Sequence, residues 1–159
     1  MYKKILIPTD GSEISNAAAR AGVEFAKQLD AEVIGLYVAP EYQYPVFIEI
    51  IPPNFPSEDE YLASMVKVGE HHLQVIVDAA RAAGLTASVK TIFSDATARE
   101  IVNTATKEAC DLIFIGSHGR SGWGQALLGS TTAKVLSSCQ IPVLVYRMGK
   151  QPEPTGTKK

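Results

Sequence analysis

Residues 111–132, DLIFIGSHGRSGWGQALLGSTT, carry the clearest structural signal in the sequence. Asp111 to Ile115 is an apolar run that is long enough for a strand but too short for a helix. A glycine-rich loop follows from Gly116 to Gly129, and Ser130 to Ser138 is expected to form a short helix. Because the apolar run lacks polar alternation, we expect a central strand that is covered on both faces of a parallel sheet.

The same strand-then-helix order repeats toward both ends of the chain. Four further runs rich in β-forming residues predict strands at residues 4–8, 31–38, 86–93 and 142–147. Helical spacing of apolar residues predicts helices over residues 14–29, 57–84 and 95–109. Ser57 and Asp95 are the expected helix caps, and five prolines argue against regular structure between residues 39 and 56. These units predict an α/β fold, with one doubly wound, open parallel five-stranded sheet and helices on both faces.

Length, charge and cysteine content limit the possible functions. The 159 residues fit one domain, which we place at residues 1–147, and residues 148–159 are expected to form a flexible C-terminal tail. The formal net charge of −2, without a dense Lys/Arg run, argues against nucleic acid and against a membrane surface as partners. No apolar segment approaches the ~20 residues of a spanning helix, and no export signal is visible. Cys110 and Cys139 are expected to be reduced thiols, which favours the cytoplasm.

Two polar stretches follow the first and fourth expected strands. In doubly wound sheets, ligands bind outside the carboxyl ends of the strands, where the strand order reverses. Residues 8–12 end the first strand, and Gly116 and Gly119 begin the loop after the fourth, where they let the backbone approach a ligand closely. Gly129 and the hydroxyl residues that follow it open a helix, whose amide groups and dipole favour an anion. A triphosphate between this loop and the helix start would satisfy both features.

Three better-known nucleotide motifs do not fit. Gly124 to Gly129 has the GxxxxG spacing of a P-loop, but Ser130 stands where the phosphate-binding Lys should be. Gly122-Trp-Gly124 lacks the third glycine of a dinucleotide-binding fingerprint. The residues Thr9-Asp-Gly-Ser12 lack the double glycine and the following Asp-Ser of the pyrophosphatase-type loop in adenylating enzymes. The adjacent His71 and His72 point to different helix faces and cannot chelate one ion.

Three ordered motifs resemble a known family. The spacing Gly116-x2-Gly119-x9-Gly129-Ser130 resembles the glycine signature of ATP-binding universal stress proteins. Residues 5–12, ILIPTDGS, and 139–145, CQIPVLV, are similar to the first strand and turn and to the last strand of that family. The resemblance spans residues 1 to about 147. It implies strand order 3-2-1-4-5 in a Rossmann-like sheet of the adenine nucleotide alpha hydrolase-like type, with ATP and Mg²⁺ or Mn²⁺ as cofactors.

The resemblance also implies roles for individual residues. Asp10 would contact the ribose or a metal on the phosphates, and the backbone of Val38 would bond to adenine, with Pro8 and Thr9 lining the base. The other implied binding residues surround or border the ribose and phosphates: Ile115, Gly116, His118, Gly119, Arg120, Gly129, Ser130, Thr131 and Thr132. Five of the implied site residues keep a second interpretation. Asp10 would then be a turn residue, the first two glycines would serve a tight loop, His118 would be structural, and Arg120 would be solvated.

Three functions are compatible with this pattern. The first is a nucleotide-responsive stress protein with at most slow ATP hydrolysis and an unknown regulatory protein partner. The second is a slow ATPase or phosphotransferase, and the third is a dimeric scaffold with a vestigial pocket. We favour the first, because the glycine pattern is complete and only Asp10 and His118 are available as general bases. The apolar last strand, at the sheet edge in the implied order, predicts a homodimer.

Overall fold

The computed structural model describes residues 2–46, 52, 54–118 and 128–148. Its five parallel strands lie in the order β3-β2-β1-β4-β5, so the predicted fold class and strand order are confirmed. The strands are β1 (Lys4–Pro8), β2 (Glu32–Ala39), β3 (Ala87–Phe93), β4 (Leu112–Gly116) and β5 (Val143–Tyr146). The helices are α1 (Glu13–Leu29), α2 (Glu58–Ala83), α3 (Thr97–Lys107) and α4 (Ser130–Ser138).

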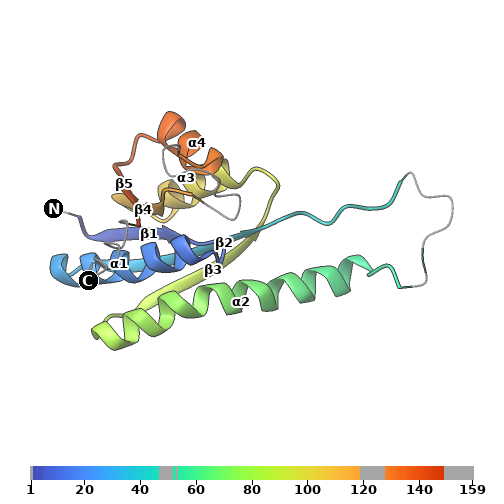
Figure 1. Ribbon diagram of the computed structural model, residues 1–159, viewed down its shortest axis with the longest axis horizontal. Helices are drawn as coiled ribbons and strands as arrows, with labels where there is room; N and C mark the ends of the chain where they lie inside the picture. Colours follow the sequence, from blue (N-terminus) through green and yellow to red (C-terminus); the bar gives the residue numbers. More distant parts are fainter. Residues whose placement is uncertain (1, 47–51, 53, 119–127, 149–159) are drawn as a thin grey trace, which may run out of the picture.

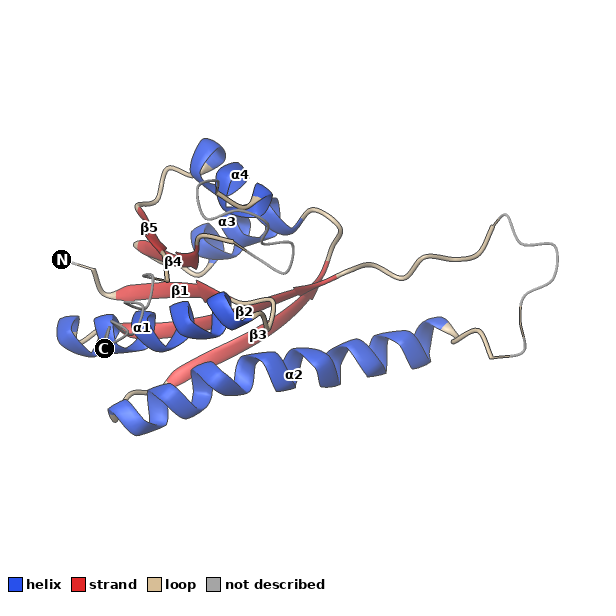
Figure 2. Cartoon of the chain, viewed as in Figure 1, coloured by secondary structure: helices blue, strands red, loops and turns tan. Residues whose placement is uncertain are grey.

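Helices cover both faces of the sheet, α1 and α2 on one and α3 and α4 on the other (Figures 1 and 2). The central strand β1 shows how the sequence produces these layers, since successive side chains of a strand point to opposite faces. Ile5 and Ile7 belong to the core on the α1 and α2 side, and Leu6 belongs to the core beneath α3 and α4. All three side chains are fully buried. Because the side chains on both faces of the strand are buried, its sequence is a continuous apolar run and does not alternate between apolar and polar residues.

Strand β1 lies between β2 and β4, where the direction of winding reverses. Ile5 is paired with Val33 of β2 on one side and with Leu112 of β4 on the other. The loops after β1 and β4 therefore leave the same edge of the sheet side by side. This is the place where α/β sheets of this kind bind their ligands.

Most helix ends lie where the sequence predicts them, and the start of α3 is an exception. Ser57 caps α2 through a capping box with Glu60, and Gly84 ends this helix in the left-handed conformation, as expected. The prediction that Asp95 caps α3 is wrong: the cap position is Ala96, which makes no side-chain capping bond. The Asp95 carboxylate instead accepts hydrogen bonds from the Glu41 amide and the Gln43 side chain, both at 3.0 Å.

The segment between β2 and α2 projects beyond the sheet, and the first turns of α2 run alongside it (Figure 1). We call its described residues 40–46 and 54–61 the arm. Three rings meet within it, with the Tyr42 centroid 5.5 Å from that of Tyr61 and 6.4 Å from that of Phe55. The Tyr42 hydroxyl donates to the Pro56 carbonyl and the Tyr61 hydroxyl donates to the Pro40 carbonyl. These contacts hold together the described arm residues, which lack regular structure before α2 begins, as their prolines predict.

The cysteines and helices agree with two further expectations. Cys110 is buried and Cys139 is half-buried, and both are free thiols. Burial raises the pKa of Cys110 to about 11, so this thiol stays protonated near neutral pH. Of the helices in the described part of the chain, none is long and apolar enough to cross a membrane.

Candidate functional site

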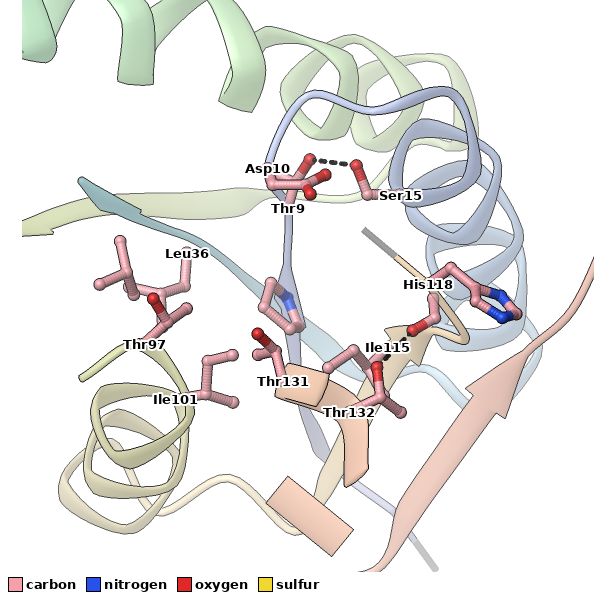
Figure 3. A pocket seen from close by; sticks show the side chains of 13 residues that line it. Thr9, Asp10, Ser15, Leu36, Thr97, Ile101, Ile115, His118, Thr131 and Thr132 are labelled. Atoms are coloured by element: carbon pink, nitrogen blue, oxygen red, sulfur yellow. Dashed lines mark hydrogen bonds between the residues drawn. The ribbon is translucent and has the colours of Figure 1, made fainter. Parts of the chain in front are cut away.

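A pocket opens at the carboxyl ends of β1, β2 and β4, and α3 and the start of α4 complete its walls (Figure 3). Nine of the predicted site residues line it: Pro8, Thr9, Asp10, Val38, Ile115, Gly116, His118, Thr131 and Thr132. Gly129 and Ser130 lie next to this set at the start of α4 but do not line the pocket. Gly119 and Arg120 lie outside the described residues. The topology thus brings together residues that lie more than a hundred positions apart in the sequence.

Four lining residues were missed by the sequence reasoning: Ser15, Leu36, Thr97 and Ile101. Leu36 lies two positions before Val38 on β2, so the period of a strand places both on one face and could have identified it. Thr97 and Ile101 lie four positions apart on α3 and share one helix face. Nothing local in the sequence marks that face as a pocket wall. This face of α3 borders the pocket because the strand order places β4, which follows α3 in the chain, beside β1.

Short hydrogen bonds fix the turn between β1 and α1. The hydroxyls of Thr9 and Ser15 lie 3.1 Å apart, and the Gly11 amide donates to the Thr9 hydroxyl at 3.2 Å. The Ser12 amide donates to an Asp10 carboxylate oxygen at 3.0 Å, and Gly11 has a φ of +76°. Asp10 is therefore both a turn residue and a pocket residue, because the turn itself holds its carboxylate at the pocket wall.

The end of β4 is tied to the start of α4. The Thr132 hydroxyl donates to the Gly116 carbonyl at 2.9 Å, and the Gly129 amide donates to the Ser117 carbonyl at 2.7 Å. The Thr132 hydroxyl proton, which we expected to serve a phosphate, is thus used within the protein. A Cβ at Gly116 would make ordinary contacts with Ile14 and with Ala18 in α1. The space left by this glycine faces α1, whereas we expected it to face the ligand.

The first turn of α4 forms part of the pocket wall. Gly129 occupies the cap position and makes no side-chain capping bond, and Thr131 lines the pocket. The amides of the first helical turn have no acceptor within the helix. These groups and the dipole of the helix favour an anionic ligand at this wall.

His118 is the titratable ring nearest to this wall. Its Nδ1 lies 2.9 Å from the Ser117 hydroxyl, which is fully buried. Its Nε2 is buried and has no hydrogen-bond partner in the described part of the chain. Figure 3 shows the imidazole ring pointing away from the cavity. This geometry agrees with the structural interpretation of His118 rather than with a general base.

The described residues contain no group of three or more His, Cys, Asp or Glu side chains that could hold a metal ion by itself. Asp10 is the single carboxylate among the described residues that line the pocket. Mg²⁺ is commonly held by one or two carboxylates together with the phosphates of a bound nucleotide. The donor set therefore fits a metal that arrives with a phosphate ligand and does not fit a permanent metal centre.

Strand order and pocket position together define a Rossmann-like α/β domain with its ligand pocket at the reversal point of the sheet. The model of the universal stress protein family matches residues 1–147, and the chain belongs to this family.

Individual relatives agree with this assignment. Universal stress protein MJ0531 of Methanocaldococcus jannaschii is 34% identical over 155 residues, which cover 95% of this chain and 85% of the relative. A solved structure of protein MJ0577 from the same organism has a TM-score of 0.78 at 30% identity and covers 95% of this chain and 99% of its own. A universal stress protein solved in complex with cAMP has a TM-score of 0.68 at 22% identity, covering 93% and 99%, and shares the fold.

Proposed function

We propose that the pocket binds ATP together with Mg²⁺ or Mn²⁺, and that the chain is a nucleotide-responsive stress protein with at most slow ATP hydrolysis. One observation carries the proposal: the ends of β1, β2 and β4 and the start of α4 meet around a single pocket. Its inner wall contains the apolar side chains of Leu36, Val38 and Ile101. Its opposite wall offers the amides and hydroxyls of α4. A nucleotide fits these two walls, because its base can pack against the apolar side chains and its phosphates can accept hydrogen bonds from α4.

The backbone of β2 supports adenine as the base. Residues of a parallel strand direct their backbone N–H and C=O alternately to the two neighbouring strands. The Leu36 carbonyl faces β1, because it accepts the Thr9 amide at 2.9 Å. Val38, two positions later, directs its groups to the same side, beyond Pro8, where β1 ends. Its N–H and C=O can therefore form a pair of hydrogen bonds with the edge of adenine, and guanine reverses the donor and acceptor there.

The residues at the start of α4, together with Asp10, favour the binding of phosphates and of a metal ion. Ser130 and Thr131 would donate to phosphate oxygens from the first turn of α4, and Gly129 would allow their close approach. Asp10 would contact the ribose or the metal. A protein of this fold has been solved with cAMP, which shows that the fold accepts an adenine nucleotide in at least that case.

Rapid hydrolysis is not expected from the described residues. A general base must reach the attacking water, and the two candidates are engaged elsewhere. Asp10 accepts the Ser12 amide, and the His118 ring lies against Ser117 and points away from the cavity. We therefore expect turnover far below the ~10 s⁻¹ that is typical of enzymes.

The test starts with freshly purified protein, which is heat-denatured, and the released nucleotides are identified by mass spectrometry. Calorimetry then compares ATP and GTP in the presence of Mg²⁺. We expect an adenine nucleotide in the first experiment and tighter binding of ATP in the second. Equal affinity for ATP and GTP contradicts the role of Val38, and no binding of ATP contradicts the proposed function.

We further propose that the protein is a cytoplasmic homodimer joined through β5 and that a regulatory protein partner reads its nucleotide state. Strand β5 is an edge of the sheet, and its residues Val143–Tyr146 are half-buried. Antiparallel pairing with a second β5 would satisfy its free edge and close at two chains. Light scattering at micromolar concentration should give a dimer mass that Val145→Lys reduces to that of the monomer. A monomer mass in the unmodified protein refutes the pairing.

A further inference from the structure

The two walls of the pocket that come from β2 and α3 are joined just outside it. Val38 on β2 and Thr97 on α3 both line the pocket. Immediately beyond them, the Ser94 amide donates to the carbonyl of Ala39 at 2.9 Å. The Ala96 amide donates to the Ser94 hydroxyl at 3.1 Å, which shapes the short turn into α3. The chain entering α3 is thus fastened to the chain leaving β2.

Asp95 extends this connection into the arm. Its two carboxylate oxygens accept separate hydrogen bonds, Oδ1 from the Glu41 amide and Oδ2 from the Gln43 side chain, each at 3.0 Å. These donors lie 54 and 52 positions earlier in the sequence. Hydrogen bonds to a charged acceptor are stronger than those between neutral groups. Asp95 therefore does not cap α3 and instead bonds to arm residues that are distant in the sequence.

The arm residues held by Asp95 continue into the aromatic cluster. Tyr42 lies between Glu41 and Gln43, and its ring packs against those of Tyr61 and Phe55. Asp95 also lines the hollow formed by these arm residues. Asp95 thus lies between the turn that joins β2 to α3 and the aromatic cluster of the arm, and its carboxylate bonds to the arm.

We propose that Asp95 is a positioning residue that couples nucleotide occupancy of the pocket to the order of the arm; this inference rests on the proposed function. A nucleotide held between Val38 and Thr97 fixes the distance between β2 and α3. The Asp95 hydrogen bonds then persist for a larger fraction of the time, and the arm residues that they hold become less mobile. By linkage, the hold on the arm raises the affinity for the nucleotide by the same factor as the nucleotide strengthens that hold.

Hydrogen exchange on the full chain, with and without ATP and Mg²⁺, tests the coupling. In the unmodified protein, ATP should slow exchange severalfold in peptides that contain the Glu41, Tyr42 and Gln43 amides. Asp95→Ala should remove this effect and weaken ATP binding by the same severalfold factor, since the coupling between two sites is reciprocal. Asp95→Asn keeps an oxygen for the Glu41 amide, and a rotated Gln43 amide can accept from its nitrogen. This variant should retain most of the effect.

Asp78→Ala is the matched control. Asp78 is exposed, as Asp95 is, and accepts from a glutamine side chain, Gln74, at 2.8 Å, and from Arg81 at 3.3 Å, but it lines neither the pocket nor the hollow of the arm. Its variant should behave as the unmodified protein does. Normal ATP affinity in Asp95→Ala, or arm exchange that ATP leaves unchanged in the unmodified protein, overturns the coupling while the proposed function stands. An unmodified protein that binds no nucleotide overturns both.

Discussion

The turn after β1 and the connection after β4 lead to the same pocket, but the protein holds them in different ways. The first runs from Thr9 to Ser12, and its own side chains bond to its own backbone. The second is anchored where it leaves β4 and where it enters α4, by bonds from Gly129 and Thr132. The first turn is therefore held by its own local bonds, whereas the described ends of the second connection are held by bonds between β4 and the start of α4.

The sharpest test of this contrast is Gly119→Val in the β4 connection. A branched side chain would enter the space that we assign to the phosphates. We expect ATP binding to fall by about a hundredfold or more, which corresponds to ~2.7 kcal/mol, with an unchanged melting temperature. Calorimetry and thermal unfolding measure the two quantities. Normal ATP binding by the folded variant would show that the phosphates are placed wrongly.

The counterpart in the β1 turn is Gly11→Ala, which should affect folding as well as binding. Gly11 has a φ of +76°, and a Cβ there would overlap the ring of His72 on α2. We expect a loss of about 2–4 kcal/mol in unfolding free energy, from backbone strain and displacement of the ring. Gly84→Ala is the control, because Gly84 has the same φ and open space around its Cβ position. It should lose only the strain, about 1 kcal/mol. Urea unfolding separates the two, and equal losses would contradict the role of His72.

A pair of Thr→Val variants compares the loops at similar burial. Thr9 is 6% exposed and Thr132 is 3% exposed. The Thr9 hydroxyl is bonded to the Ser15 hydroxyl and the Gly11 amide, and the Thr132 hydroxyl is bonded to the Gly116 carbonyl. We expect losses of about 2 kcal/mol for Thr9→Val and about 1 kcal/mol for Thr132→Val, at about 1 kcal/mol for each hydrogen bond. The reverse order in urea unfolding would mean that the β4 connection is the better anchored of the two.

The smallest change in stability is expected for Thr131→Val. Thr131 lines the pocket beside the buried Thr132. Its hydroxyl is assigned to the ligand, so the unfolding free energy should change by less than about 0.5 kcal/mol. ATP affinity should fall severalfold, as measured by calorimetry. A stability loss as large as that of Thr132→Val would indicate a structural role instead.

The sequence predicted features that depend on local interactions more accurately than features that depend on residues far apart in the chain. Strands and helices depend on local patterns, so β4 and α4 were placed within one residue or exactly. Thr97 and Ile101 were missed because a pocket wall on α3 depends on which strands are neighbours. Asp95 was assigned the wrong role, because a local cap competes with donors more than 50 positions away. Long-range partners of this kind leave no periodic trace in the sequence.

The packing of His72 against the β1 turn makes the protein convenient to study by proton NMR. The chain has three histidines, His71, His72 and His118. The His72 ring lies at the Cβ position of Gly11 and edge-on to the Tyr37 ring, with centroids 5.1 Å apart. His118 belongs to the pocket lining at the end of β4, although its ring points away from the cavity. The imidazole Cε1 protons resonate apart from most other signals, so two of three such resonances should shift during a nucleotide titration. His71, on the exposed side of α2, supplies the internal reference.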